Sequence, residues 1–73
     1  MTTPALLDTC GTALHGHQWQ RALARDLGVS ERTVRYWCAG RAVPDGVWAE
    51  IGQLLHKRGA QCRELAKSLE RRG

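Results

Sequence analysis

The run "ALARDLGVSERTVRYW", residues 22–37, constrains the fold most, because it places a single glycine inside an otherwise helix-forming segment. A glycine just beyond a helix end adopts the left-handed conformation without steric cost and turns the chain sharply. Ser30 follows two residues after Gly28 and is a favourable N-cap for a new helix. The run therefore predicts two short helices joined by a turn.

A first helix is expected over about residues 4–15. Thr3 is its expected N-cap, and Pro4 is expected at the first helical position, where a missing N–H costs nothing. Apolar residues then recur at steps of three and four before Gly16 ends the helix; they are Leu6, Leu7, Cys10 and Leu14. The second helix takes residues 18–27, and a third, unusually polar one takes about residues 31–38.

The last helical segment follows the loop "AGRAVPDG", in which Asp45 is the expected N-cap. Gly59 leaves two alternatives, a break into two short helices or one helix of more than twenty residues. The second is favoured, because a lone glycine costs only about 1 kcal/mol in a helix. Positions at alternating steps of four and three also match a coiled-coil seam, with one poor member, Arg58. They are Ile51, Leu55, Arg58, Cys62, Leu65 and Leu69.

No stretch alternates as a strand would, so the predicted fold is all-α. We expect one domain over residues 1–73, with four to five helices, a helix-turn-helix core at about 4–58 and a basic helical tail at 59–73. A chain of 73 residues buries only a small core. A partner chain is therefore expected to contribute to the fold, and the C-terminal helix is the expected dimerisation element.

Basic residues are concentrated in two regions. Residues 20–41 carry a net charge of +3 and residues 57–72 carry +4, within a chain of net charge +4. Such an excess favours a polyanionic partner, nucleic acid before acidic membrane, although a solvated helix face is an equally ordinary explanation.

Other classes of protein have little support. Three separated cysteines indicate neither a disulfide framework nor a zinc site, and we expect them to be reduced and mostly buried. His15 and His17 lack further metal ligands at suitable spacing. No catalytic set or phosphate loop is present, so we expect no enzyme, cofactor or small-molecule ligand. Without a signal peptide or membrane-spanning run, we expect a cytoplasmic protein.

Four positions match the requirements of a helix-turn-helix. Ala24 is small where the helices cross, Gly28 turns the chain, Val29 fills the corner, and Val34 packs back against the second helix. Through "QRALARDLGVSERTVRYWCAGRAVP" the chain resembles the Cro and phage-repressor-like regulators, also called the Xre family, over about residues 4–56. The resemblance implies DNA binding, and it implies that Gly40 and Arg41 lie where the family approaches the DNA backbone.

The direction of each side chain predicts its role. In this arrangement the third helix, about Ser30–Cys38, is the recognition helix, and its N-terminal residues enter the major groove. Candidate base contacts are Glu31, Arg32, Thr33, Arg35 and Tyr36, although Glu31 could equally pair with Arg35. Candidate phosphate contacts are Gln20, Ser30 and Arg41. Arg21 and Arg25 could equally be solvated charges. Three tryptophans are expected in the core; they are Trp19, Trp37 and Trp48.

The leading hypothesis is a sequence-specific regulator of double-stranded DNA, most simply a homodimeric phage, prophage or bacterial repressor. Its expected operator is an inverted repeat with half-sites about 34 Å apart. The expected dimer interface is formed by Cys62, Leu65 and Leu69. The alternative is a small helical protein-interaction module, antitoxin-like or an accessory subunit, that uses the C-terminal helix.

Overall fold

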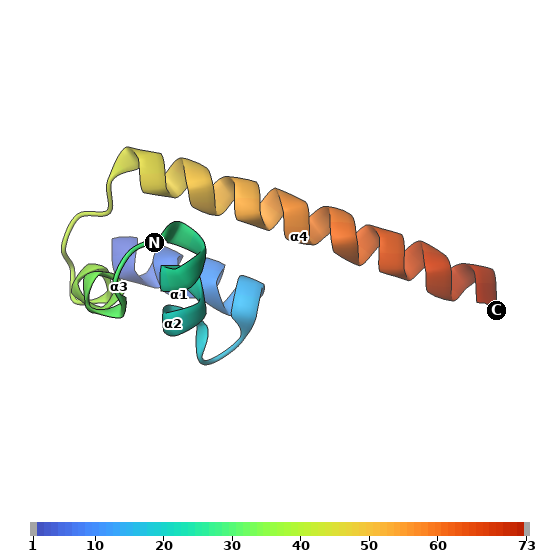
Figure 1. Ribbon diagram of the computed structural model, residues 1–73, viewed down its shortest axis with the longest axis horizontal. Helices are drawn as coiled ribbons and strands as arrows, with labels where there is room; N and C mark the ends of the chain where they lie inside the picture. The colour runs from blue at the N-terminus through green and yellow to red at the C-terminus, as the bar shows by residue number, and fades with distance from the viewer. Residues whose placement is uncertain (1, 73) are drawn as a thin grey trace.

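The computed structural model describes residues 2–72 and contains four helices, α1 (Thr3–His15), α2 (Trp19–Leu27), α3 (Glu31–Cys38) and α4 (Asp45–Arg72). Residues 2–72 include no strand, and the all-α prediction is confirmed. The three short helices pack together beneath the first half of α4, and the second half of α4 projects beyond them (Figure 1).

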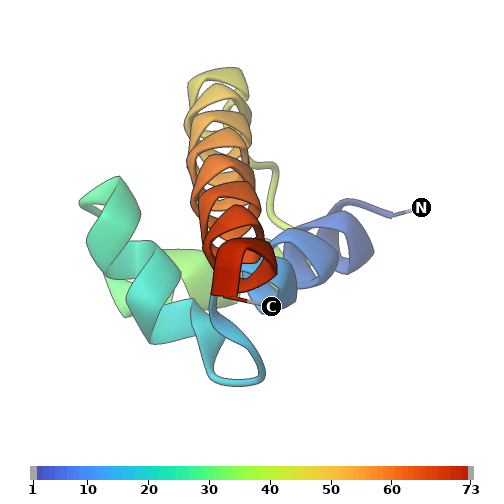
Figure 2. The same ribbon diagram turned by 90° about the vertical axis from the view of Figure 1, so that its right-hand side faces the viewer.

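The core takes one almost inaccessible side chain from each helix: Leu7, Leu23, Val34 and Ile51. Viewed from the C-terminal end of the molecule, α2 lies to the left of α4 and α1 to its right (Figure 2). Trp19 and Trp37 are buried as predicted, and Trp48 is half-buried against the same cluster. Each amphipathic helix therefore contributes its apolar stripe to one shared core.

Two predicted N-caps are each wrong by one residue. Thr2 is the N-cap of α1, its hydroxyl accepting a hydrogen bond from the Ala5 N–H at 3.3 Å, so Thr3 is already helical. Proline is tolerated throughout a first turn and therefore does not distinguish between these starts. Asp45 is the first residue of α4 and not its cap. The Pro44 carbonyl instead accepts the first hydrogen bonds, from the N–H groups of Val47 and Trp48.

A tight contact joins α1 to α2. Gly11 is buried, and a Cβ atom added there would overlap the Trp19 ring. The indole Nε1 of Trp19 donates a hydrogen bond to Asp8 Oδ1 at 3.0 Å, which satisfies the polar atom of an otherwise buried side chain. Leu6, predicted to share the apolar stripe of α1, is 41% exposed, because α2 covers the side of α1 that carries Leu7, Gly11 and Leu14.

The helix α4 runs without a break through Gly59, as favoured from the sequence. The last anchor to the domain is Arg58, whose guanidinium donates a hydrogen bond to the Leu14 carbonyl near the end of α1. Beyond it, every residue from 60 to 72 is exposed. We call residues 59–72 the tail. Cys62 lies in the tail, so the expectation of mostly buried cysteines is wrong there, whereas Cys10 and Cys38 are half-buried free thiols.

Within residues 2–72, no helix combines the length and the apolar character needed to cross a membrane.

Candidate nucleic-acid interface

The turn between α2 and α3 has the geometry predicted for it. Gly28 adopts φ 71° and ψ 28°, the left-handed conformation that an L side chain rarely adopts. The next N–H, of Val29, donates to the Ala24 carbonyl at 3.0 Å and closes the end of α2. Ser30 then caps α3, its Oγ accepting the Thr33 N–H at 3.1 Å. The turn between α2 and α3 is thereby closed by one backbone hydrogen bond and by the Ser30 cap.

The helix α3 has one buried and one exposed face. Val34 is fully buried and Trp37 is 4% exposed, so both anchor the helix in the core. The opposite face presents exposed side chains at helical spacing; they are Glu31, Arg32, Arg35 and Tyr36. A helix held by two apolar anchors with polar groups over the rest of its surface is free to contact a partner along that surface.

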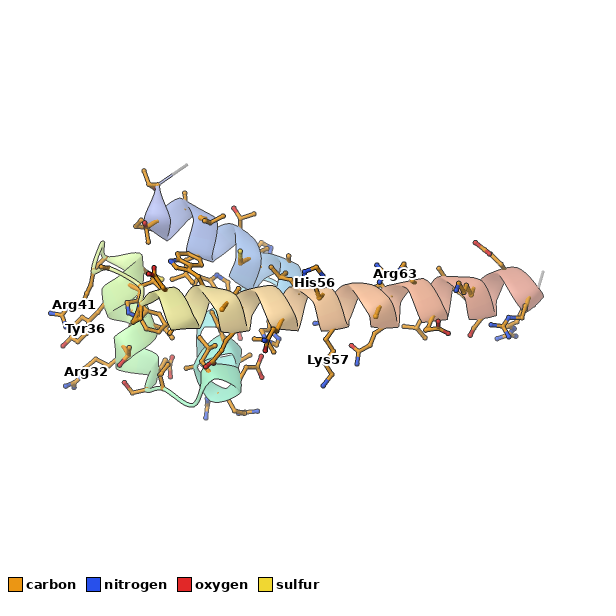
Figure 3. The ribbon with its side chains drawn as sticks, turned by 90° about the horizontal axis from the view of Figure 1, so that it is seen from above. Arg32, Tyr36, Arg41, His56, Lys57 and Arg63 are labelled. Atoms are coloured by element: carbon orange, nitrogen blue, oxygen red, sulfur yellow. The ribbon has the colours of Figure 1, made fainter. Side chains whose placement is uncertain are left out.

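The loop after α3 returns to the same face. Gly40 has φ 113°, and the Arg41 N–H donates to the Tyr36 carbonyl at 3.0 Å. This turn stacks the Arg41 guanidinium over the Tyr36 ring, 4.7 Å from its centroid, in a cation–π contact. Arg32, Tyr36 and Arg41 lie together at the end of the molecule opposite the tail and point away from it (Figure 3). We call these three side chains the α3 face.

Some predicted contact residues have partners within the chain. Arg35 pairs with Glu31 at 3.6 Å, the alternative left open by their spacing of four residues. Thr33 is half-buried, and its hydroxyl lies 2.8 Å from that of Ser30. The Gln20 side-chain amide donates a hydrogen bond to Cys38 Sγ at 3.5 Å, so this predicted phosphate contact has a partner at the end of α3. Arg32 and Arg41 are the cations most directly presented.

A shallow concavity lies along α2 beside the start of α3. It is lined by His17, Gln18, Gln20, Arg21, Ala22, Arg25 and Glu31. Arg21 and Arg25 are exposed on its wall, so it is a cationic hollow next to the start of α3. Sequence reasoning gave these two arginines no definite role. Their spacing of four residues, which places them on one side of α2, was the available signal.

The chemistry available at this surface is hydrogen bonding and charge. Burial and the nearby Asp8 carboxylate raise the pKa of Cys38, so its thiol is neutral at physiological pH. Residues 2–72 contain no group of three or more His, Cys, Asp or Glu side chains positioned to hold a metal ion. The accessible functional groups are guanidinium groups, a phenol, hydroxyls and a carboxylate.

Comparison of the chain with protein-family models, with curated proteins and with solved structures finds no match.

Proposed function

We propose that the protein binds double-stranded DNA in a sequence-specific manner, with α3 in the major groove. The observation that carries the proposal is the α3 face, where Arg32 and the stacked pair Tyr36 and Arg41 project together from a helix anchored by a glycine turn. A bidentate guanidinium recognises guanine in the major groove, and a phenol or hydroxyl can contact a single base edge or a phosphate.

The charges around this surface support a polyanionic partner. Arg21 and Arg25 line the hollow beside α3, and Arg41 lies on the α3 face itself. Phosphate contacts from such cations supply sequence-independent affinity and orient the domain, whereas contacts to base edges supply specificity. In this proposal Arg32 and Tyr36 contact bases, and Arg21, Arg25 and Arg41 contact the backbone. By occupying a promoter, such a protein acts most simply as a repressor.

The test begins with selection of bound sites from a random duplex pool. Arg32→Ala is then compared with wild type on the selected site and on a scrambled duplex. We expect the preference for the selected site to fall by about 1 to 3 kcal/mol. The matched control is Arg63→Ala, an equal loss of charge on α4 that lies away from the α3 face (Figure 3). Unchanged discrimination in Arg32→Ala would contradict the assigned orientation.

Salt dependence separates this proposal from the protein-interaction module. Binding through several phosphates must weaken steeply as salt rises, because condensed counterions are released. Affinity for the selected duplex is measured from about 50 to 200 mM salt. A pool that yields no preferred sequence, together with retention on DNA only at very low salt, would instead favour the protein-interaction module, whose exposed Leu65 and Leu69 would form the contact.

A further inference from the structure

The exposed apolar residues of the tail continue the face of α4 that packs on the domain. Leu65 and Leu69 lie fourteen residues after Ile51 and Leu55 respectively, so each is rotated by only about 40° from its counterpart in a helix of 3.6 residues per turn. Ile51 is 1% exposed, whereas Leu65 and Leu69 are 66% and 67% exposed. Cys62, seven residues after Leu55, falls on the same line. We call Cys62, Leu65 and Leu69 the tail stripe.

Uncharged residues border the tail stripe on both sides. Gln61, Ala66 and Ser68 flank it, and the charged side chains of residues 63–71 lie farther around the helix, where Lys67 and Glu64 approach to 3.9 Å. Arg72 is the one cation near the stripe, at its very end. A second uncharged apolar surface can therefore pack on the stripe without burying a charge, and a second copy of the tail supplies such a surface.

We infer that a second copy of the chain covers the tail stripe, with the two tails antiparallel. The stripe lies within about 40° of the face of α4 that carries Ile51 and Leu55, and that face packs on the copy's own domain. In a parallel pair both domains would have to occupy the space between the two helices. In an antiparallel pair each domain lies beyond the end of the other tail, and only the tails meet.

The alternating spacing of four and three residues between the apolar positions determines how two antiparallel tails align. Placing Leu65 opposite the partner's Leu69 centres the pair near residue 67 and confines the overlap to about residues 62–72, roughly 16 Å of helix. Farther overlap would bring the tail end against the partner's domain near Arg58, which binds the Leu14 carbonyl. The contact is smaller than the roughly 800 Å² per partner of a standard interface, so we expect a weak dimer.

This arrangement has a consequence that rests on the proposed function. The α3 face lies at the end of the molecule opposite the tail (Figure 3), so an antiparallel tail pair directs its two α3 faces away from each other. The dimer would then hold two separate DNA segments. That differs from the single inverted repeat with closely spaced half-sites expected from the sequence.

The first experiment measures mass in solution at about 100 µM protein, a concentration suited to a weak interface. Wild type is expected to populate a dimer, and Leu65→Glu with Leu69→Glu to be monomeric. Because both leucines are exposed, the monomer should keep its helical circular dichroism. The matched control is Ala60→Glu, which adds one carboxylate on the opposite side of the tail and should retain the dimer. A monomeric wild type would overturn the inference.

The second experiment distinguishes antiparallel from parallel tails by oxidation with copper phenanthroline and peptide mapping. In the antiparallel pair Ser68 lies within about 3 Å, along the axis, of its counterpart, whereas the two Cys62 residues are about 15 Å apart. Cys62→Ser combined with Ser68→Cys should therefore form a disulfide-linked dimer rapidly, and wild type should link through Cys62 far more slowly. Rapid linking through Cys62 with slow linking through residue 68 would show parallel tails and overturn the arrangement.

The third experiment tests bridging with two duplexes that each carry one selected site, one immobilised and one fluorescent. Wild type should retain the fluorescent duplex, and the double glutamate variant should bind each duplex singly but lose retention. Absence of all DNA binding alongside a tail-dependent dimer would contradict the proposed function alone. If two protomers bound side by side on one duplex and the fluorescent duplex were not retained, the two α3 faces of the dimer would not point away from each other, and the arrangement would be wrong.

Discussion

The two halves of α4 carry the same spacing of apolar residues but have different surroundings. In the first half Ile51 is buried and Leu54 and Leu55 are half-buried against α1 and α2. In the tail, Leu65 and Leu69 occupy the equivalent face and are about two-thirds exposed. The difference lies in the length of the neighbours, because α1 ends at His15 and Arg58 makes the last contact with it.

An apolar stripe therefore indicates which face of a helix is suited to packing, but it does not indicate which partner packs there. In the first half of α4 the stripe stabilises the fold, since its burial removes apolar surface from water. In the tail the same pattern contributes little to the isolated chain and becomes stabilising only with a partner. Three predictions test this distinction, in order of decreasing effect.

The largest difference is expected between two truncations at equivalent positions. Ile51→Ala should lower the free energy of unfolding by about 2 to 5 kcal/mol, because it leaves a cavity in a closed core. Leu65→Ala should change it by about 0.5 kcal/mol or less at dilute protein, because its side chain is exposed. Urea unfolding at micromolar concentration checks both. Equal losses would show that the tail folds back onto the domain in solution.

Smaller changes in stability are expected for two Gly→Ala substitutions within helices, and the two changes should have opposite signs. Gly11→Ala should destabilise the domain by about 1 to 3 kcal/mol, because the new Cβ overlaps the Trp19 ring. At Gly59 the nearest atom to a new Cβ is Nη1 of the exposed Arg63 side chain at 3.4 Å, so alanine there should favour the helix by up to about 1 kcal/mol. Thermal unfolding followed by circular dichroism measures both. A loss of stability in Gly59→Ala would contradict a continuous exposed helix.

The smallest effect concerns thiol reactivity and leaves stability unchanged. Cys62 is exposed in the tail, whereas Cys38 is half-buried and has a raised pKa. Since the thiolate is the reactive form, a raised pKa reduces its fraction at any pH below that pKa. At dilute, monomeric protein, iodoacetamide at pH 8 should therefore label Cys62 well before Cys38, and labelling of Cys38 should increase as the pH is raised. Peptide mass spectrometry gives both rates, and faster labelling of Cys38 would contradict the packing of α3.

Local signals predicted much of this fold. The glycine turn, the Ser30 cap and the limits of α3 follow from backbone preferences that act over three or four residues. The continuity of α4 through Gly59 followed from weighing a small propensity cost against a long periodic pattern. Helix starts were less accurate, because Thr2 and Thr3 can both cap a helix that begins near Pro4.

Contacts between distant residues were not predicted. The fit of Trp19 against Gly11 depends on how α1 and α2 cross, and the Arg58 bond to Leu14 joins residues 44 positions apart. Arg58 is the one charged member of the coiled-coil spacing in α4 and was expected to fit that spacing poorly. Its guanidinium instead satisfies a carbonyl near a helix end, where unpaired acceptors remain. Tyr36 and Arg41 were each expected at the site, but their stacking depends on the turn at Gly40.

Because α4 is one continuous helix, a change in the length of the tail also rotates its side chains around the helix axis. Because Ile51 and Arg58 fix the helix on the domain, each residue inserted after Gly59 would lengthen the tail by about 1.5 Å and rotate its leucines by about 100°. An insertion of one or two residues would therefore turn the leucines toward a different side, while seven would restore their direction to within about 20° and add about 10 Å. The tail is thus a spacer whose length can change without loss of its facing direction only in steps close to a whole number of helical turns.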